Sequence, residues 1–388
     1  MFAVATPGLE QLVAAELADL HITDHQVVDG GVGFGPTGRQ LLEVNLHLRT
    51  ASRVLVRLAH FRALTFAELE RRARRIPWER VLRQGQRVAL RVTCRKSRLY
   101  HSDAVAERVG RDLQERLGAT VTASARDESD PEPGSAGTQL IIVRFDHDHC
   151  TVSADSSGAH LHQRGYRTSV TEAPMRETLA AALIIASGWD RQSPLLDPFC
   201  GSGTIPIEAA LMAAHIAPGR NRDFQFMNWP SHDPVEWERM RSAAIRREKR
   251  EATPVIMGSD RSASAIRAAT ENAERADVSA HIHFDRLDAL RVEGPESPGW
   301  IVSNPPYGVR LGDSGESRRL LAQFGVRLRQ AFGGWHLGLL ATAQLERTIG
   351  IPLDSRLRTT NGGLRVQVLA GNIPGTSARS TSQAGVGS

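Results

Sequence analysis

Four consecutive residues, Asn304, Pro305, Pro306 and Tyr307, carry groups that could activate an amine on a planar ring. Such an amine is a poor nucleophile because its lone pair is delocalised into the ring. The side-chain oxygen of Asn304 and the carbonyl oxygen of Pro305 could accept hydrogen bonds from the two N–H groups of this amine. These hydrogen bonds would aim the nitrogen lone pair at a transferable methyl group. Two prolines restrict the loop, and an aromatic ring at 307 could stack on the target. These four residues are therefore our candidate catalytic residues.

A glycine-rich turn is expected directly after the apolar segment Leu195–Leu196. Its candidate cofactor-binding residues are Asp197, Phe199, Gly201, Ser202 and Gly203. Glycines let a ligand approach the backbone, and a helix beginning near Ile205 would supply free amides. The turn is not a P-loop, and Pro206 stands where a dinucleotide fingerprint needs a third glycine. We therefore expect S-adenosylmethionine as the cofactor, with Asp197 facing its ammonium group, and an ordinary tight turn is the alternative.

Two further acidic residues follow later apolar segments, and both are candidate cofactor contacts. Asp260 follows residues 254–257, where a carboxylate could accept both ribose hydroxyls. Asp288 follows residues 282–284, where it could accept a hydrogen bond from the adenine amino group. A helix cap at Asp260 and an ordinary loop at Asp288 are the alternatives. At successive strand ends, these acids and Asn304 would lie along one edge of a parallel sheet, where ligands of open α/β sheets bind.

The elements that would position these residues alternate between short apolar strands and longer segments. The expected strands of the C-terminal half are 195–196, 254–257, 282–284, 300–302 and 337–340. Their rhythm predicts an α/β fold with a largely parallel sheet. The N-terminal half mixes expected strands at 2–5, 27–28, 32–34, 53–58, 88–94, 140–145 and 150–154 with helices at 66–76 and 102–117. In the second of these helices we expect Ser102 to cap the start and Gly118 to end the helix.

The net charge of +5 is distributed unevenly. Residues 49–116 hold 18 Arg or Lys against 7 Asp or Glu, which favours an anionic partner such as nucleic acid. Only two of the basic residues in the whole chain are lysines, so a coding bias towards arginine is the alternative. Our candidate phosphate contacts are Arg74, Arg75, Arg95, Lys96 and Arg98.

Other features narrow the class of protein. The sequence has no apolar run of roughly 18 residues, and its N-terminus does not resemble a signal peptide. Cys94, Cys150 and Cys200 lack the spacing of a metal site, and we expect reduced thiols and no metal. We therefore expect a cytoplasmic protein.

Several motifs together resemble a known family. They are residues 7–10, 97–118, 162–167 and 173–182, the turn at 195–204, and residues 258–260 and 304–308. The sequence resembles the THUMP-domain class I RNA guanine-N2 methyltransferases. The resemblance implies an N-terminal ferredoxin-like segment at 1–45, a THUMP RNA-binding domain at 46–155 and a linker at 156–173. A Rossmann-like class I methyltransferase domain would follow at 174–372. The resemblance does not cover residues 373–388, which are rich in Gly, Ser and Thr, and we expect a disordered tail there.

The resemblance also implies S-adenosylmethionine as the cofactor and N2-methylguanosine in RNA as the product. The RNA would be 23S rRNA in preference to tRNA. The candidate cofactor-binding set is completed by Thr178, Arg261, Ala289 and Asn304. Amino-methyltransferases acting on DNA adenine or protein glutamine share Asn-Pro-Pro-Tyr, and the basic N-terminal half favours RNA over both. A non-catalytic RNA-binding assembly factor would not need this complete set of site residues.

Overall fold

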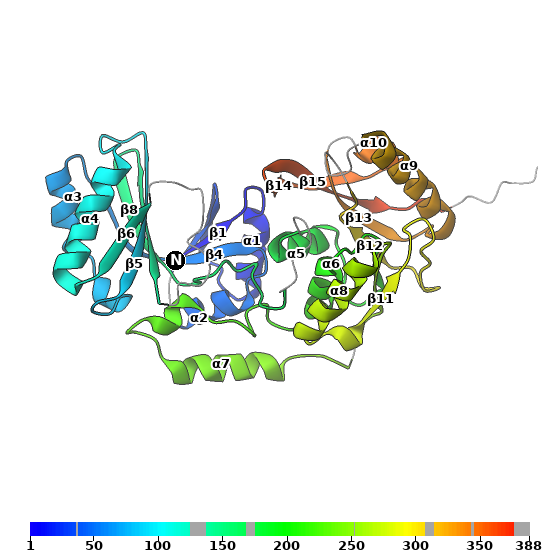
Figure 1. Cartoon of the computed structure of the whole chain (residues 1–388), viewed down its shortest axis with the longest axis horizontal. Coiled ribbons are helices and arrows are strands. Elements are labelled where there is room, and N and C mark those ends of the chain that lie inside the picture. Colours follow the sequence, from blue (N-terminus) through cyan, green and yellow to red (C-terminus); the bar gives the residue numbers. More distant parts are fainter. Residues whose placement is uncertain are drawn as a thin grey trace, which may run out of the picture. The chain divides into compact units, whose positions relative to one another are not determined.

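The computed structural model describes residues 1–35, 38–124, 137–167, 175–251, 253–306, 314–342 and 345–375. Tyr307 and nearly all of the expected tail lie outside these ranges, as do residues 168–173 of the expected linker. The chain forms two compact units (Figure 1). The first consists of residues 1–167, 176–182 and 214–250, and the second of residues 168–175, 183–213 and 251–388.

The first unit is built on one eight-stranded sheet in the order β2-β3-β1-β4-β8-β7-β5-β6. Its strands are β1 (Phe2–Ala5), β2 (His25–Val28), β3 (Gly31–Phe34), β4 (Ala51–Arg62), β5 (Arg87–Arg95), β6 (Thr120–Ser124), β7 (Gln139–Asp146) and β8 (His149–Asp155). Its N-terminal helices are α1 (Glu10–Asp19), α2 (Gly38–His47), α3 (Phe66–Ala73), the short η1 (Trp78–Arg80) and α4 (Ser102–Leu117). The antiparallel pairing of β4 with β8 joins the first four strands to the last four. All the strands expected in this half are present.

The two expected ends of α4 have different outcomes. Gly118 ends the helix in the left-handed conformation, at φ 58°, as predicted. The prediction that Ser102 caps the helix is wrong, because Ser102 is already its first helical residue. The capping position belongs to His101, whose side chain makes no capping hydrogen bond.

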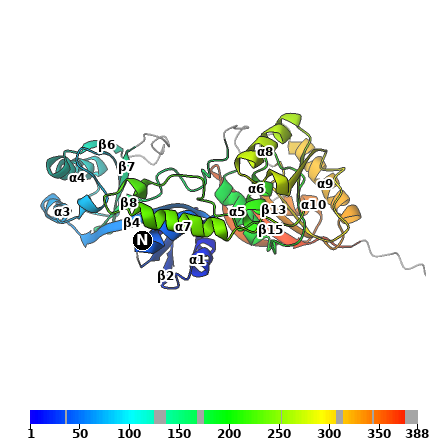
Figure 2. The ribbon, with the colours of Figure 1, turned by 90° about the horizontal axis from the view of Figure 1, so that it is seen from below.

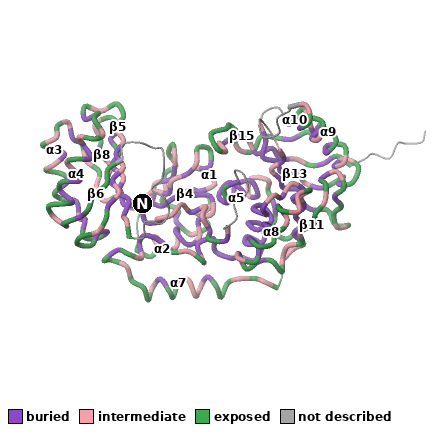
Figure 3. Tube along the Cα trace, viewed as in Figure 1, coloured by how far each residue is buried: buried purple, intermediate pink, exposed green. Residues whose placement is uncertain are grey.

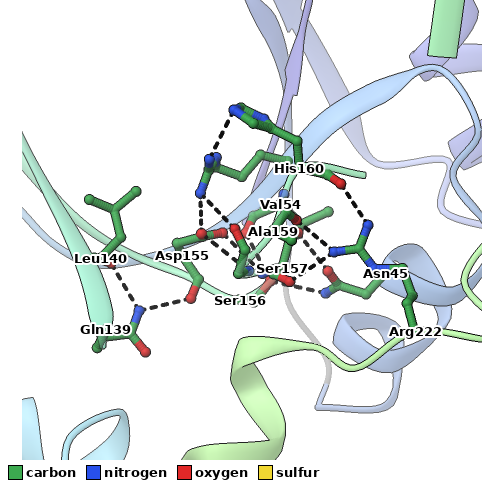
Figure 4. Close-up of polar contacts among 12 residues, drawn as sticks. Asn45, Val54, Gln139, Leu140, Asp155, Ser156, Ser157, Ala159, His160 and Arg222 are labelled. Atoms are coloured by element: carbon green, nitrogen blue, oxygen red, sulfur yellow. Dashed lines mark hydrogen bonds and ion pairs between the residues drawn. The ribbon is translucent and has the colours of Figure 1, made fainter. Parts of the chain in front are cut away.

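Residues 214–250 group with the first unit, although they follow the glycine-rich turn in the sequence. They contain η2 (Gln225–Asn228) and α7 (Pro234–Arg246). The guanidinium of Arg222 holds this segment by donating to four main-chain carbonyls, and Figure 4 labels three of the acceptor residues, Ser157, Ala159 and His160. The acceptors are the carbonyl oxygens of Ser157, Ala159, His160 and Gln163, at 3.2, 2.6, 2.7 and 3.3 Å.

A buried ion pair lies beside these carbonyls. Arg53 donates to Asp155, and both side chains are buried. The Asp155 carboxylate also accepts the main-chain amides of Ser157 and Gly158, at 3.0 and 3.2 Å. Because a buried polar group without a partner is costly, this network fixes the course of residues 155–163.

The Arg222 contacts predict a large loss of stability on truncation. Hydrogen bonds to a charged group contribute about 1.5–3 kcal/mol each, and Arg222→Ala removes four of them together. We expect Arg222→Ala to lower the free energy of unfolding by at least about 3 kcal/mol, measured by denaturant unfolding. Arg239→Ala is the control, since its side chain on α7 is 79% exposed. Equal midpoints for the two variants would contradict this role.

The second unit is built on a seven-stranded sheet in the order β11-β10-β9-β12-β13-β15-β14. Its strands are β9 (Leu195–Asp197), β10 (Ile256–Asp260), β11 (Ile282–Arg286), β12 (Trp300–Ser303), β13 (His336–Ala341), β14 (Asp354–Asn361) and β15 (Leu364–Asn372). The five expected strands are confirmed and are mutually parallel. The antiparallel β14–β15 hairpin was not predicted.

Helices cover this sheet and complete its core. They are α6 (Thr204–Ala213), α8 (Ala263–Arg275), the short η3 (Ser279–His281), α9 (Ser314–Ala331) and α10 (Leu345–Ile349), and α5 (Glu177–Ala186) is divided between the two units. Helices α6 and α8 lie side by side in both Figure 1 and Figure 2 and pack on β9, β10 and β11. Every residue of α6 is buried, and β13 is largely buried as well (Figure 3). In the described part of the chain, no helix has the length and apolar character of a membrane span.

Strand β9 is the point where the strand order reverses. The chain moves from β9 to β10 and β11 on one side, then returns to place β12 and β13 on the other. Loops that leave the carboxyl ends of β9, β10 and β12 therefore diverge, and they leave a crevice where ligands of open α/β sheets bind.

Candidate active site

A cavity of about 280 Å³ lies where these loops diverge. Its lining consists of Pro198, Phe199, Asp260, Arg261, Asp288, Ala289, Asn304, Pro305, Pro306 and Leu320. Eight of these ten residues belong to the predicted catalytic and cofactor-binding sets. Residues from four separate places in the sequence thus converge because parallel strands end at one edge of the sheet.

The remaining predicted residues have other surroundings. Gly203 has φ 82°, and a Cβ there would lie 2.9 Å from the Cβ of Ala269, so glycine is required for packing against α8. The main-chain carbonyl of Ser202 accepts the side-chain amide of Asn272 at 3.0 Å. Thr178 is buried in the part of α5 that groups with the first unit, and it does not line the cavity.

Two amides of the glycine-rich turn are tied to β10. The amide of Cys200 donates to the Ser259 carbonyl at 2.9 Å, and the amide of Gly201 donates to Asp260 Oδ2 at 3.2 Å. The other Asp260 oxygen accepts the amide of Ser262 at 2.8 Å. The cap of α8 is Ser262 rather than Asp260, so the capping alternative for Asp260 does not apply.

The Asp260 carboxylate accepts hydrogen bonds from the protein and also lines the cavity. Its two hydrogen bonds orient it, and each oxygen keeps a further lone pair for a ligand. Asp288 is an exposed residue of the lining, and its Oδ1 accepts a hydrogen bond from the amide of Leu290 at 2.8 Å. Asp260 is therefore held by its own loop and by the glycine-rich turn, and Asp288 is held by its own loop. Both acids keep acceptor capacity for a ligand.

Asn304 presents the least satisfied polar atom of the lining. Its Oδ1 is buried, and no group among the described residues donates a hydrogen bond to it. An unsatisfied buried acceptor costs about 1–3 kcal/mol, so native proteins keep few of them. An acceptor left free at the wall of a cavity suits an N–H donor that arrives with a ligand.

Asp197, which was expected to face the ammonium group of the cofactor, has two hydrogen-bond partners from the protein, and its role towards the cofactor stays a prediction. Its Oδ1 accepts the hydroxyl of Ser303 at 2.5 Å and the amide of Phe199 at 3.1 Å. The side chain is buried and does not line the cavity. Burial raises the pKa of Asp197 to about 7, although both hydrogen bonds oppose that shift.

Two lining residues, Pro198 and Leu320, were not among the predicted site residues. Pro198 lies inside the predicted turn, so its place beside Asp197 was a signal that could have included it. Leu320 lies on α9, and an aliphatic residue in an amphipathic helix carries no sign that it faces a ligand.

The five predicted phosphate contacts are all exposed, and none has an ion-pair partner among the described residues. They fall into two groups. Arg74 and Arg75 follow α3, near the C-terminal end of α4, where Arg116 donates to the Arg74 carbonyl at 3.1 Å. Arg95, Lys96 and Arg98 precede the start of α4. Since α4 has 16 residues, it is about 24 Å long, and the two groups belong to its opposite ends.

Part of the positive charge in residues 49–116 has partners inside the first unit. Arg53 pairs with Asp155, and Arg116 pairs with Glu79 at 2.5 Å. Arg108 pairs with Glu70 at 3.3 Å. The excess of arginine therefore overstates the charge available to a partner, although the two exposed groups and further arginines such as Arg62 and Arg87 remain at the surface.

Comparison with known proteins agrees with this geometry. Family models match residues 1–55 ("RlmL ferredoxin-like domain"), 63–155 ("THUMP domain") and 164–350 ("RMKL-like, methyltransferase domain"). The protein of Synechocystis named "Putative RNA methyltransferase slr0064" is 32% identical over 371 residues, or 95% of each chain. The chain belongs to this family of THUMP-containing, RlmL-like methyltransferases.

Two further relatives extend the comparison. The "Ribosomal RNA large subunit methyltransferase K/L" of Syntrophotalea carbinolica is 36% identical over 385 residues, covering 95% of this chain and 53% of that one. This chain thus spans about half the length of its K/L relatives. The solved structure of "SMU.472, a putative methyltransferase complexed with SAH" has a TM-score of 0.83 and 29% identity, covering 97% of this chain and 98% of that one.

The raised pKa of Asp197 predicts a pH-dependent stability difference. Between the unfolded pKa, 3.8, and the folded pKa, about 7, the folded chain binds a proton that the unfolded chain does not. The contribution of Asp197 to the free energy of unfolding therefore falls as pH rises through this window and stays low above it. The side-chain amide of the Asp197→Asn variant does not titrate. We expect the Tm of this variant minus that of the wild type to be roughly 4–8 °C larger at about pH 8 than at about pH 5. The same difference at both pH values would contradict the raised pKa.

Proposed function

We propose that the chain is an S-adenosylmethionine-dependent methyltransferase that forms N2-methylguanosine in RNA, with large-subunit ribosomal RNA as the substrate. The observation that carries the proposal is the buried Oδ1 of Asn304, which has no donor among the described residues and lies in the same cavity as Asp260 and Asp288. This arrangement suits a planar amine on one side and an adenosyl cofactor on the other. The family of the chain and its exposed basic groups support RNA as the carrier of that amine.

The cavity has suitable groups for S-adenosylmethionine. Asp260 would accept the two ribose hydroxyls, Asp288 would accept the adenine amino group, and Phe199 would contact the cofactor from the glycine-rich turn. When bound, the cofactor supplies an electrophilic methyl group. SMU.472, which shares this fold over nearly its whole length, is described as complexed with SAH.

The chain itself contributes positioning to the reaction. Asn304 Oδ1 and the Pro305 carbonyl oxygen would accept hydrogen bonds from the two N–H groups of the guanine amine. These hydrogen bonds would turn the nitrogen lone pair towards the methyl group. Methyl transfer would form an N–C bond as the S–CH3 bond of the cofactor breaks and its electron pair stays on the sulfur, and it would leave the nitrogen with one proton too many. An amide oxygen and a peptide carbonyl are very weak bases, so this proton leaves to water once the bond has formed.

Recognition of RNA would involve the first unit. The amine of a stacked and paired guanine is not accessible to a side-chain amide, so the target nucleotide must leave the stack. Relatives at 34–36% identity are named for the ribosomal large subunit, which supports 23S rRNA over tRNA as the substrate and the cytoplasm as its location. If the modification is found in tRNA alone, tRNA replaces 23S rRNA as the substrate and the proposed methyl transfer to guanine is unchanged.

The decisive test combines gene deletion with a site variant. We expect nucleoside mass spectrometry to show that cells without the gene lose N2-methylguanosine from 23S rRNA. The wild-type gene should restore it and Asn304→Ala should not. In purified enzyme, Asn304→Ala should lower kcat by at least about 100-fold while the Kd for S-adenosylmethionine changes by less than about threefold.

Asp260→Ala is the matched variant, because it removes a cofactor contact and keeps the amine acceptor. We expect it to raise the Kd for S-adenosylmethionine strongly, with partial recovery of kcat at saturating cofactor. Equal loss of cofactor binding and turnover in Asn304→Ala would contradict the role of Asn304. Loss of N6-methyladenine or methylglutamine from the deletion cells would overturn the choice of guanine.

The two exposed basic groups predict how RNA binding responds to salt. Each phosphate contact releases condensed counterions, so its loss flattens the dependence of log K on log salt by about 0.7–0.9. We expect Arg95→Ala/Lys96→Ala/Arg98→Ala and Arg74→Ala/Arg75→Ala to weaken RNA binding and to flatten this slope. Filter binding over a salt series measures both effects. Arg239→Ala is the control. If removal of a basic group gives the same RNA affinity and salt slope as this control, that group does not contact the RNA.

A further inference from the structure

Strands β9 and β12 stay connected beyond the end of their main-chain pairing. The last residue pair in register is Leu196 with Ile301. Past that pair, each strand continues towards its own loop. The hydroxyl of Ser303 on β12 donates to Asp197 Oδ1 on β9 at 2.5 Å, and both side chains are buried. A side-chain hydrogen bond therefore extends the connection to the edge where the two loops begin.

The same carboxylate oxygen reaches both halves of the site. Asp197 Oδ1 also accepts the amide of Phe199, which lines the cavity on the cofactor side. Ser303 directly precedes Asn304, which lines the cavity on the amine side. Two hydrogen bonds to Asp197 Oδ1 and one peptide bond thus connect Phe199 to Asn304. Phe199 belongs to the loop expected to hold the methyl donor, and Asn304 is expected to hold the amine that accepts the methyl group.

We propose that Asp197 and Ser303 form a positioning pair that keeps Asn304 in register with the glycine-rich turn. The proposal rests on the function proposed above. Neither residue lines the cavity, so the pair acts through Asn304 and Phe199 rather than by touching a substrate. Methyl transfer requires the reacting atoms to be aligned at about 3–3.5 Å, and a displacement of about 1 Å lowers the rate about 100-fold.

The neighbouring strand supplies a matched control. Ser259 on β10 directly precedes Asp260, as Ser303 on β12 precedes Asn304. Ser259 is 3% exposed, and its hydroxyl has no hydrogen-bond partner among the described residues. Ser259→Ala and Ser303→Ala therefore remove the same atom from buried positions at the same edge of the sheet. Only the second breaks a hydrogen bond.

The test compares Ser303→Ala, Asp197→Ala, their double variant, Asp197→Asn and Ser259→Ala in the full chain. We expect Ser303→Ala to lower kcat by about 10- to 100-fold, with the Kd for S-adenosylmethionine within about threefold of the wild type. Ser259→Ala should match the wild type. The double variant should be no slower than Asp197→Ala, since one hydrogen bond cannot be lost twice. Asp197→Asn keeps an acceptor oxygen and should be faster than Asp197→Ala.

Three outcomes would overturn the pair. They are equal kcat values for Ser303→Ala and Ser259→Ala, a cofactor Kd that weakens as much as kcat falls, and additive effects in the double variant. The side-chain amide resonance of Asn304, observed by selective ¹⁵N labelling, adds a readout that needs no substrate. It should shift in Ser303→Ala and not in Ser259→Ala, and an unshifted resonance would also overturn the pair. A wild-type enzyme that methylates no RNA would instead refute the proposed function, and the resonance would still test the pair.

Discussion

The site depends on the reversal of strand order at β9. Because β10 and β12 flank β9 and run parallel to it, Asp260 and Asn304 reach the same edge from segments 44 residues apart in sequence. The loops after β9 and β12 must separate there, which produces the cavity. They must also stay in register, and beyond the last main-chain pair that task falls to side chains such as Asp197 and Ser303.

This arrangement lowers the stability of the second unit. A fully buried carboxylate whose pKa is raised to about 7 opposes stability near neutral pH, and a buried Asn304 oxygen without a partner among the described residues does so as well. Both groups lie at the strand ends nearest the cavity. Stability lost at a site that must be preorganised for a ligand is a common trade in enzymes. In the first unit, the buried Asp155 carboxylate accepts hydrogen bonds from Arg53 and from the amides of Ser157 and Gly158 (Figure 4), and burial nevertheless raises its pKa.

Local patterns in the sequence were sufficient to predict the five parallel strands and the residues at their ends. Each of those strands is a short apolar run, and the position after such a run is fixed by the chain itself. Contacts that depend on strand order were not predictable in this way. The bond between Ser303 and Asp197 joins residues 106 apart, and Ser303 has no local feature that distinguishes it from Ser259, which lacks a partner among the described residues. The grouping of residues 214–250 with the first unit is likewise invisible in the sequence, because chain order alone places them after the glycine-rich turn.

The division of labour between the units explains why the Asn-Pro-Pro-Tyr motif is shared by enzymes with different substrates. Two acceptors at Asn304 and Pro305 recognise the N–H bonds of an amine, and these bonds are alike in guanine, adenine and glutamine. The motif therefore fixes the reaction and leaves the identity of the substrate open. Selection must come from surfaces that contact the rest of the substrate. The exposed basic groups belong to the two ends of α4, a helix about 24 Å long, so they would read the backbone of an extended or folded RNA rather than a single nucleotide.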